Sequence, residues 1–213
     1  MKKEPKLKSC VICGNEFKQF KSTQKVCSAP CAIEYAKQKE KEKAEREWRK
    51  EKRQRKIEAN PKIRKGYLQQ EVNKLARMID EHFNYCCIDC PKLLEYGKPR
   101  AVNGAHFHNV GGNENLRFNL HNIHSATMWC NYYNTEHKQG YQKGLIDRYG
   151  KDYLETVKDL KHEYKYLGLS SVEIEEALKK ARKLVREFDE QIKGNLDGSM
   201  ARAKFNLIIG IYE

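Results

Sequence analysis

The sequence predicts a mostly α-helical protein with a small metal-stabilised hairpin core and an N-terminal cysteine finger. Three observations support this class: most of the eight cysteines occur in short-spaced pairs, long segments carry apolar residues at helical spacing, and 33% of the residues are charged. With 213 residues and a mean hydropathy of −0.90, the chain can build one modest core. We therefore expect one compact domain with extended, solvated appendages.

Residues 1–31 contain the first cysteine cluster, Cys10-x2-Cys13-x13-Cys27-x3-Cys31. Two short-spaced pairs can offer four thiolates to one Zn²⁺, and the metal would supply folding energy that so short a segment cannot gain from a core. The N-terminus lacks the apolar stretch of an export signal, which favours the cytoplasm, where paired cysteines bind metal rather than form disulfides. We predict a four-cysteine zinc finger over residues 1–31; the alternative is four free thiols in a flexible tail.

Residues 32–65 are rich in Lys, Glu, Arg, Gln and Ala, and pair glutamate with arginine four residues later, which predicts a long exposed helix ending near Asn60 before Pro61. Trp48 is nearly its only large apolar residue, so the segment lacks the seam of a coiled coil. This basic helix is expected to be either a solvated spacer or a direct nucleic-acid contact.

Charge is distributed unevenly, because residues 1–65 hold 21 of the 42 basic residues and only 9 of the 29 acidic ones. Such an asymmetry suits an arm that binds a polyanion, and DNA is the expected one, since no apolar stretch long enough to enter a membrane accompanies the charge. The candidate nucleic-acid contacts are Lys50, Lys52, Arg53, Arg55, Lys56, Arg64 and Lys65.

Residues 66–150 are expected to form the core. Apolar residues at helical spacing between Tyr67 and Phe83 predict an amphipathic helix, and residues 85–135, broken by glycines, predict a small hairpin followed by a helix starting near Cys130. Cys87-x2-Cys90 and Cys130 would pin the hairpin to that helix through a second Zn²⁺. Its fourth ligand stays open among Cys86, His82, His121 and His124.

Residues 151–194 predict a helical hairpin. Its first helix surrounds Leu154 to Leu167 and ends at Gly168, and its second runs from a Ser170-x2-Glu173 capping box to Gly194. The apolar seam over 174–192 suits packing against the preceding helix or against a second subunit, so a homodimer is one option. Residues 195–213 form a tail that is expected to be either a small strand or disordered.

Four residues of the core carry potential chemistry. Hydrolysis of a phosphodiester needs a base and a cation that stabilises charge on the phosphate. His106 is the candidate base, Asn122 would orient it, and Asn131, with Asn103, could offer oxygen ligands to Mg²⁺ or Mn²⁺. Each residue taken alone suits a structural role better than a catalytic one; the order Cys-x2-Cys, His, Asn, Cys-Asn within 45 residues favours metal-assisted cutting of nucleic acid.

The same residues carry a resemblance to a known family. The motifs Cys87-Ile-Asp-Cys90, Gly104-Ala-His106-Phe, Leu116-Arg-Phe-Asn119-x2-Asn122-Ile-His124 and Cys130-Asn131 resemble the phage lambda NinG (Rap) recombination proteins. The resemblance implies a ββα-metal (HNH-like) core and a structure-specific endonuclease that acts on branched DNA such as Holliday junctions and D-loops. It gives His106, Asn122 and Asn131 the three HNH positions.

Three departures from the family pattern bear on the metals. The family usually has Asp at the position of Asn103, Thr127 replaces its third zinc cysteine, and its Ser-Gly-Asn reads Thr135-Glu136-His137 here. His137 is a candidate replacement ligand. Structural zinc is therefore expected at one or two sites.

We carry three hypotheses. The first is a metal-dependent endonuclease on branched DNA, encoded by a phage and located in the cytoplasm of its bacterial host. The second is a zinc-finger protein with a decayed nuclease site that binds branched DNA or recruits recombination proteins. The third is an HNH enzyme on ordinary duplex DNA.

Overall fold

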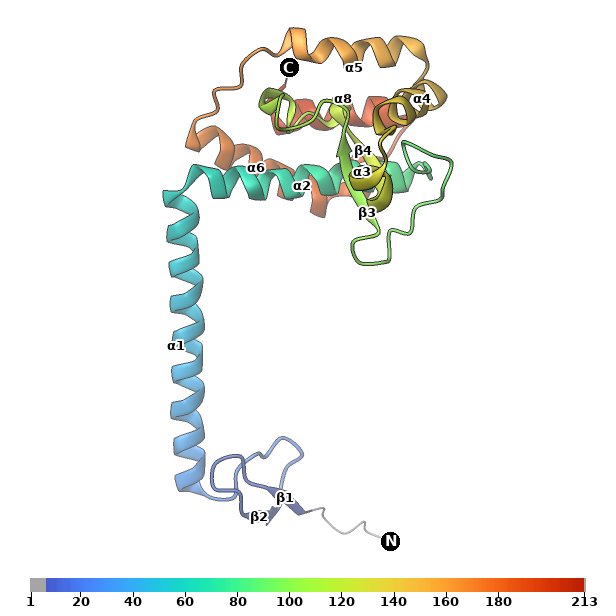
Figure 1. Ribbon diagram of the computed structural model, residues 1–213. Coiled ribbons are helices and arrows are strands. Elements are labelled where there is room, and N and C mark those ends of the chain that lie inside the picture. Colours follow the sequence, from blue (N-terminus) through green and yellow to red (C-terminus); the bar gives the residue numbers. More distant parts are fainter. Residues whose placement is uncertain (1–6, 213) are drawn as a thin grey trace. The chain divides into compact units, whose positions relative to one another are not determined.

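A computed structural model describes residues 7–212, apart from the side chains of residues 57–59 and 61. The chain divides into two compact units, Met1–Ala59 and Asn60–Glu213. Helices dominate both units, which confirms the mostly helical prediction, and two short antiparallel sheets complete them (Figure 1). The second unit begins at Asn60 rather than at the predicted residue 66, because Asn60 caps its first helix and residues 61–65 form the start of that helix.

The first unit consists of a small hairpin and one long helix. Strands β1 (Leu7–Ser9) and β2 (Glu16–Lys18) pair with Lys8 opposite Phe17. Helix α1 (Ala29–Ala59) carries exposed ion pairs such as Glu45–Arg49, and Lys52 lies over the ring of Trp48. Because local side-chain pairs stabilise this helix, the sequence predicted it closely, although it begins at Ala29 rather than Ala32.

The second unit contains a hairpin and seven helices within the described residues. Strands β3 (Val102–His106) and β4 (Ile123–Thr127) pair antiparallel, with Ala105 opposite His124. Two 3₁₀ turns lie between them, η1 (Glu114–Leu116) and η2 (Leu120–Asn122). The helices are α2 (Pro61–His82), α3 (Met128–Tyr133), α4 (His137–Tyr149), α5 (Lys151–Glu163), α6 (Ser171–Arg186), α7 (Phe188–Gln191) and α8 (Gly198–Ile209).

Two apolar clusters pack around the hairpin. One joins α2, α6 and α8 with Ile123 of β4, and the other joins α4 and α5 with Ala105, Ala126 and Cys130. Helix α2 lies along the hairpin and beside α6 (Figure 1). The apolar seam of α6, including Ile174 and Leu178, is buried within this unit, so it serves intramolecular packing rather than an interface with a second copy.

The C-terminal segment differs from the prediction. Residues 198–209 form α8 instead of a strand or a disordered tail, with Asp197 as N-cap and Gly210 in the left-handed conformation at the C-terminus. Ala201, Phe205 and Ile209 face the core at helical spacing. The pattern was hard to recognise because fully buried Arg202 adjoins this face, where its guanidinium pairs with buried Asp80 at 2.6 Å.

The predicted C-terminal hairpin also has different limits. Helix α5 ends at Glu163, before Gly168, and the second predicted helix breaks at Glu187 into α6 and α7. The predicted capping box is present, with both bonds formed between Ser170 and Glu173. No described helix is long and apolar enough to span a membrane.

Candidate functional site

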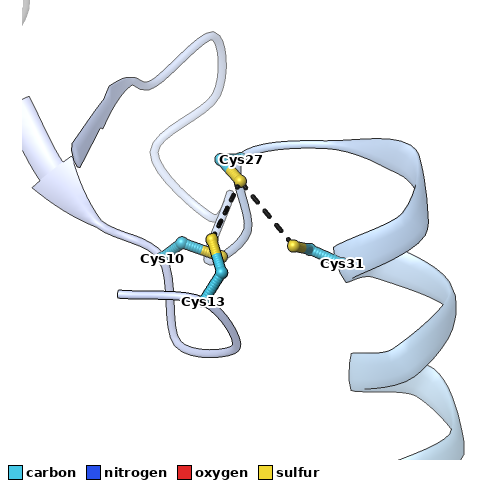
Figure 2. A group of neighbouring side chains, drawn as sticks. All are labelled: Cys10, Cys13, Cys27 and Cys31. Carbon is cyan, nitrogen blue, oxygen red and sulfur yellow. Dashed lines mark hydrogen bonds between the residues drawn. The ribbon is translucent and has the colours of Figure 1, made fainter. Parts of the chain in front are cut away.

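The first cysteine cluster has the geometry of a tetrahedral metal site. The thiols of Cys10, Cys13, Cys27 and Cys31 lie within 4.8 Å of one another and point toward a common centre (Figure 2). The Sγ–Sγ distances are 3.5 Å from Cys13 to Cys27 and 3.7 Å from Cys27 to Cys31. Zinc with Zn–S bonds of about 2.3 Å separates its sulfurs by about 3.8 Å. The four residues therefore fit structural zinc, and all four cysteines are free of disulfides.

The backbone of the first unit prepares this cluster. The Cys10 amide donates a hydrogen bond to the Asn15 carbonyl at 2.9 Å and closes the turn after Cys10. Gly14 in this turn has φ +77°, a conformation that favours glycine. The amide of Cys13 donates to the Cys10 sulfur and lowers the pKa of that thiol to about 6. The thiolate is the form that ligates a metal, so the turn favours metal binding.

The second cluster brings together three thiols. Cys87, Cys90 and Cys130 lie within 4.8 Å of one another, and the sulfurs of Cys90 and Cys130 are 3.5 Å apart. Thr127, at the position of the missing thiol, donates its amide to the Cys87 sulfur at 3.3 Å and accepts the Cys130 amide on its hydroxyl at 3.1 Å. Its side chain caps α3. Three thiolates fit zinc, but the fourth ligand must come from another group.

The loop of Cys87 and Cys90 lies directly on α4. A Cβ atom at Gly144 would lie 1.9 Å from the carbonyl oxygen of Ile88, and one at Gly140 would lie 2.6 Å from that of Asp89. Both glycines are therefore needed for this approach. Burial raises the pKa of the Cys87 thiol to about 12, so a metal would have to displace its proton.

His137 occupies a different position from the one predicted. Its Nδ1 lies 2.6 Å from a carboxylate oxygen of Asp89, inside the Cys87–Cys90 loop, and His137 is not part of the thiol cluster. The other carboxylate oxygen of Asp89 is buried without a partner among the described residues. His121 and His124 instead bond the hydroxyls of Tyr153 and Tyr141.

The two remaining alternatives for the fourth zinc ligand are also outside the cluster. Within the described residues, the group of close thiols includes neither Cys86 nor His82. His82 packs edge-on against Phe83 and Phe188. None of the five residues proposed from the sequence, His137 included, thus completes the second cluster.

His106 ends β3 and lies against α2. Its Nε2 is 3.2 Å from the carbonyl oxygen of Arg117 and 3.4 Å from the Gln69 amide nitrogen. Because a carbonyl can only accept, the shorter contact assigns the ring proton to Nε2 and leaves the lone pair on Nδ1. Burial lowers the pKa of His106, partly offset by the Arg117 carbonyl. The imidazole is therefore neutral near pH 7.

Asn122 organises the backbone beside His106. Its carbonyl oxygen accepts the His108 amide at 2.7 Å, and its amide donates to the carbonyls of His108 and Leu116 at 3.1 and 3.2 Å. Asn122 therefore fixes the segment that follows His106, rather than orienting the imidazole directly as predicted. The residues that contact the ring, Gln69 and Arg117, were not among the predicted ones; Arg117 stands within the recognised Leu-Arg-Phe-Asn motif, whereas Gln69 gave no signal.

The two candidate metal-binding asparagines are half-buried. Asn131 lies on α3 beside Cys130, and Asn103 lies on β3 opposite Ala126. Among the described residues, neither side-chain amide has a hydrogen-bond partner, so both oxygens are free to bind a cation. Neither is hydrogen-bonded to His106, whose ring contacts Gln69 and Arg117. Alternation along β3 places Asn103 and His106 on opposite faces of the strand.

The predicted nucleic-acid contacts fall into two groups. Arg64 is largely buried and donates to the Ser171 carbonyl at 3.0 Å, and Lys65 pairs with Glu114 at 3.1 Å, so the structure uses both within the second unit. The others are exposed on α1, namely Lys50, Lys52, Arg53, Arg55 and Lys56.

One comparison with known proteins gives a match. The family model described as bacteriophage lambda NinG protein matches residues 2–191, from before the first cysteine cluster to the end of α7. No curated protein and no solved structure matches the chain at a significant level.

Proposed function

The chain belongs to the bacteriophage lambda NinG family of recombination proteins, and from this membership we propose that it is a metal-dependent endonuclease that cuts branched DNA. The observation that carries the proposal is the environment of His106: a neutral imidazole with one nitrogen fixed by a backbone carbonyl and the other free. A general base needs this arrangement near pH 7. The proposed core is the HNH type, since β3 and β4 are followed directly by α3.

In this proposal, Nδ1 of His106 takes the proton from the water that attacks the scissile phosphorus. The Nε2–H bond to the Arg117 carbonyl fixes the plane of the ring and stabilises the imidazolium that forms. Gln69 accepts from the Arg117 side chain at 3.1 Å, which holds both groups beside the ring. Asn122 keeps the following backbone in place through three hydrogen bonds.

The free amide oxygen of Asn131 fits a hard cation that retains most of its waters, and Asn103, on the face of β3 opposite His106, is the weaker candidate ligand. Mg²⁺ or Mn²⁺ bound there would neutralise charge on the scissile phosphate and on the leaving oxygen. Asn131 gains its position from α3, which Cys130 and the Thr127 cap connect to β4.

A second candidate function is binding of branched DNA without cutting. It is favoured by Asn103, which provides a neutral amide where the family usually has a carboxylate. Within the described residues, the His106 ring contacts the Arg117 carbonyl and the Gln69 amide, and no carboxylate is hydrogen-bonded to it. A neutral amide at position 103 would bind Mg²⁺ more weakly than a carboxylate would.

The proposal is tested with zinc-loaded protein, a synthetic four-way junction and a matched linear duplex, in Mg²⁺, in Mn²⁺ and without added metal. We expect metal-dependent nicks near the branch. His106→Ala should lower the cutting rate by about 10²- to 10⁴-fold and leave junction binding intact. His162→Ala, at an exposed histidine of α5, is the matched control.

Other results of the cutting experiment would support different conclusions. Cutting by His106→Ala at the wild-type rate would refute the assignment of the base. Binding without cutting in any metal would favour the second candidate, and Asn103→Asp would then be the substitution to restore activity. Equal cutting of junction and linear duplex would indicate an HNH enzyme on ordinary DNA.

A further inference from the structure

Helix α3 presents large apolar side chains to solvent. Met128, Trp129, Tyr132 and Tyr133 are exposed by 44%, 62%, 69% and 67%, and Cys130 is its one buried residue. Positions 128 and 132, and positions 129 and 133, are four residues apart, so the exposed side chains form one continuous stripe. We call these four residues the aromatic face. In a chain with a mean hydropathy of −0.90, such a face indicates a binding surface.

The aromatic face does not hold α3 in place. The helix is capped by the Thr127 hydroxyl, joined to the thiol cluster through Cys130, and bonded from the Met128 amide to the Ala101 carbonyl at 3.2 Å. Its rings are therefore available to a ligand and are positioned in advance, which lowers the entropy cost of binding.

Positive charge borders the aromatic face. The loop that accepts the Met128 amide carries Arg100, which is exposed, adopts φ +61° and has no carboxylate partner among the described residues. Lys98 of the same turn is exposed and pairs with Glu95. A ligand with flat apolar surfaces and negative charge would match both features.

We propose that the aromatic face stacks on unpaired bases of branched or single-stranded DNA. Every base offers a π-face to an aromatic ring, and phosphates would lie near Arg100. Four side chains on a six-residue helix are few for a stable protein interface, which needs about 800 Å² per partner. The inference rests on the proposed function for its location, since Asn131 lies between Trp129 and Tyr132 in sequence.

This proposal gives a physical reason for preferring a branched substrate. Inside a linear duplex both faces of each base are covered by its neighbours, whereas a branch point or a single strand exposes them. The aromatic face would gain contacts only with the second kind of DNA. The aromatic face, which lies beside the proposed cation site, would thus favour branched over linear DNA.

Trp129 provides a direct measurement, because Trp48 is the only other tryptophan. Trp48→Phe leaves Trp129 as the sole tryptophan emitter, and this protein is titrated with the junction, a single strand and a linear duplex without added Mg²⁺. We expect the junction and the single strand to quench Trp129 fluorescence and the duplex to leave it nearly unchanged. His106→Ala in this background should quench equally, because stacking precedes cutting.

Substitutions measure the contribution to affinity. Trp129→Ala, Tyr132→Ala and Tyr133→Ala should each weaken junction binding by about 5- to 150-fold, which corresponds to one stacked base, and change duplex binding much less. Trp129→Phe should retain most of the affinity. Tyr166→Ala, at a tyrosine exposed by 88%, is the control, and zinc content and circular dichroism verify folding.

Three results would overturn the inference: unchanged Trp129 emission at saturating junction, equal loss of affinity for junction and duplex, or dissociation of a dimer by the alanine variants. Cutting without quenching would refute the stacking face and leave the nuclease. Quenching without cutting would refute the nuclease and leave the stacking face. Absence of binding to any DNA would refute both.

Discussion

Acid should destabilise the second unit through its buried histidines, and His121 allows the effect to be calculated. Burial, together with the charge of Arg202, lowers the pKa of His121 from 6.5 to about 4. Above pH 6.5 the imidazole is neutral in both the folded and the unfolded chain. As the pH falls below 6.5, the unfolded chain takes up the proton first, so stability declines until the pH reaches the folded pKa.

The size of the effect follows from the two pKa values. Between pH 7 and pH 5, His121 alone should remove about 2 kcal/mol from the free energy of unfolding, out of about 3.4 kcal/mol for the full shift. Burial lowers the pKa of His124 well below its ordinary value, so His124 acts in the same direction. The second unit should therefore be markedly less stable at pH 5.

The assay is urea unfolding of zinc-saturated protein at pH 7 and pH 5, for the wild type and for His121→Gln. Glutamine keeps a hydrogen-bonding group near the Tyr153 hydroxyl, which bonds His121 at 2.8 Å, but does not titrate. Any loss of zinc in acid affects both proteins, so the difference between them isolates His121. The reasoning is wrong if both lose the same stability within about 0.5 kcal/mol.

Three further predictions concern metal, core and DNA. Thr127→Cys should add a fourth thiolate to the second cluster and slow zinc transfer to a chelator by about tenfold or more, while Thr127→Ser, which keeps the cap, should not. Asp80→Asn should destabilise the second unit by about 3–5 kcal/mol in urea, because it leaves buried Arg202 unpaired, whereas Glu114→Gln at an exposed pair should cost about 1 kcal/mol or less. Replacing five exposed basic residues of α1 by glutamine should reduce the slope of log affinity against log salt by up to about 4.5 if α1 contacts DNA, and leave it unchanged if α1 is a spacer; the five are Lys50, Lys52, Arg53, Arg55 and Lys56.

Elements determined by neighbours in sequence were predictable. Helix α1 follows from ion pairs within one turn, and the cysteine spacing indicated both thiol clusters. Helix α8 was missed because Arg202 reads as a solvent-facing residue, and only Asp80, 122 positions away, explains its burial. The environment of His106 likewise depends on a residue distant in sequence, since Gln69 lies 37 positions before it. Contacts between distant residues leave no periodic signal in one sequence.

The two halves of the proposed site depend on different forces, which makes them separable. His106 is held by the Arg117 carbonyl beside the apolar cluster of α2, and Gln69 supports it through the Arg117 side chain. Asn131 and the aromatic face lie instead on α3, whose one buried side chain is Cys130. Removal of zinc from the second cluster should therefore release α3 and leave the His106 environment in place. In the Trp48→Phe protein, chelation should abolish junction quenching of Trp129 and cutting, while the acid titration of His106, followed by NMR, stays unchanged. A shifted His106 titration would show that the thiol cluster supports the whole hairpin rather than α3 alone.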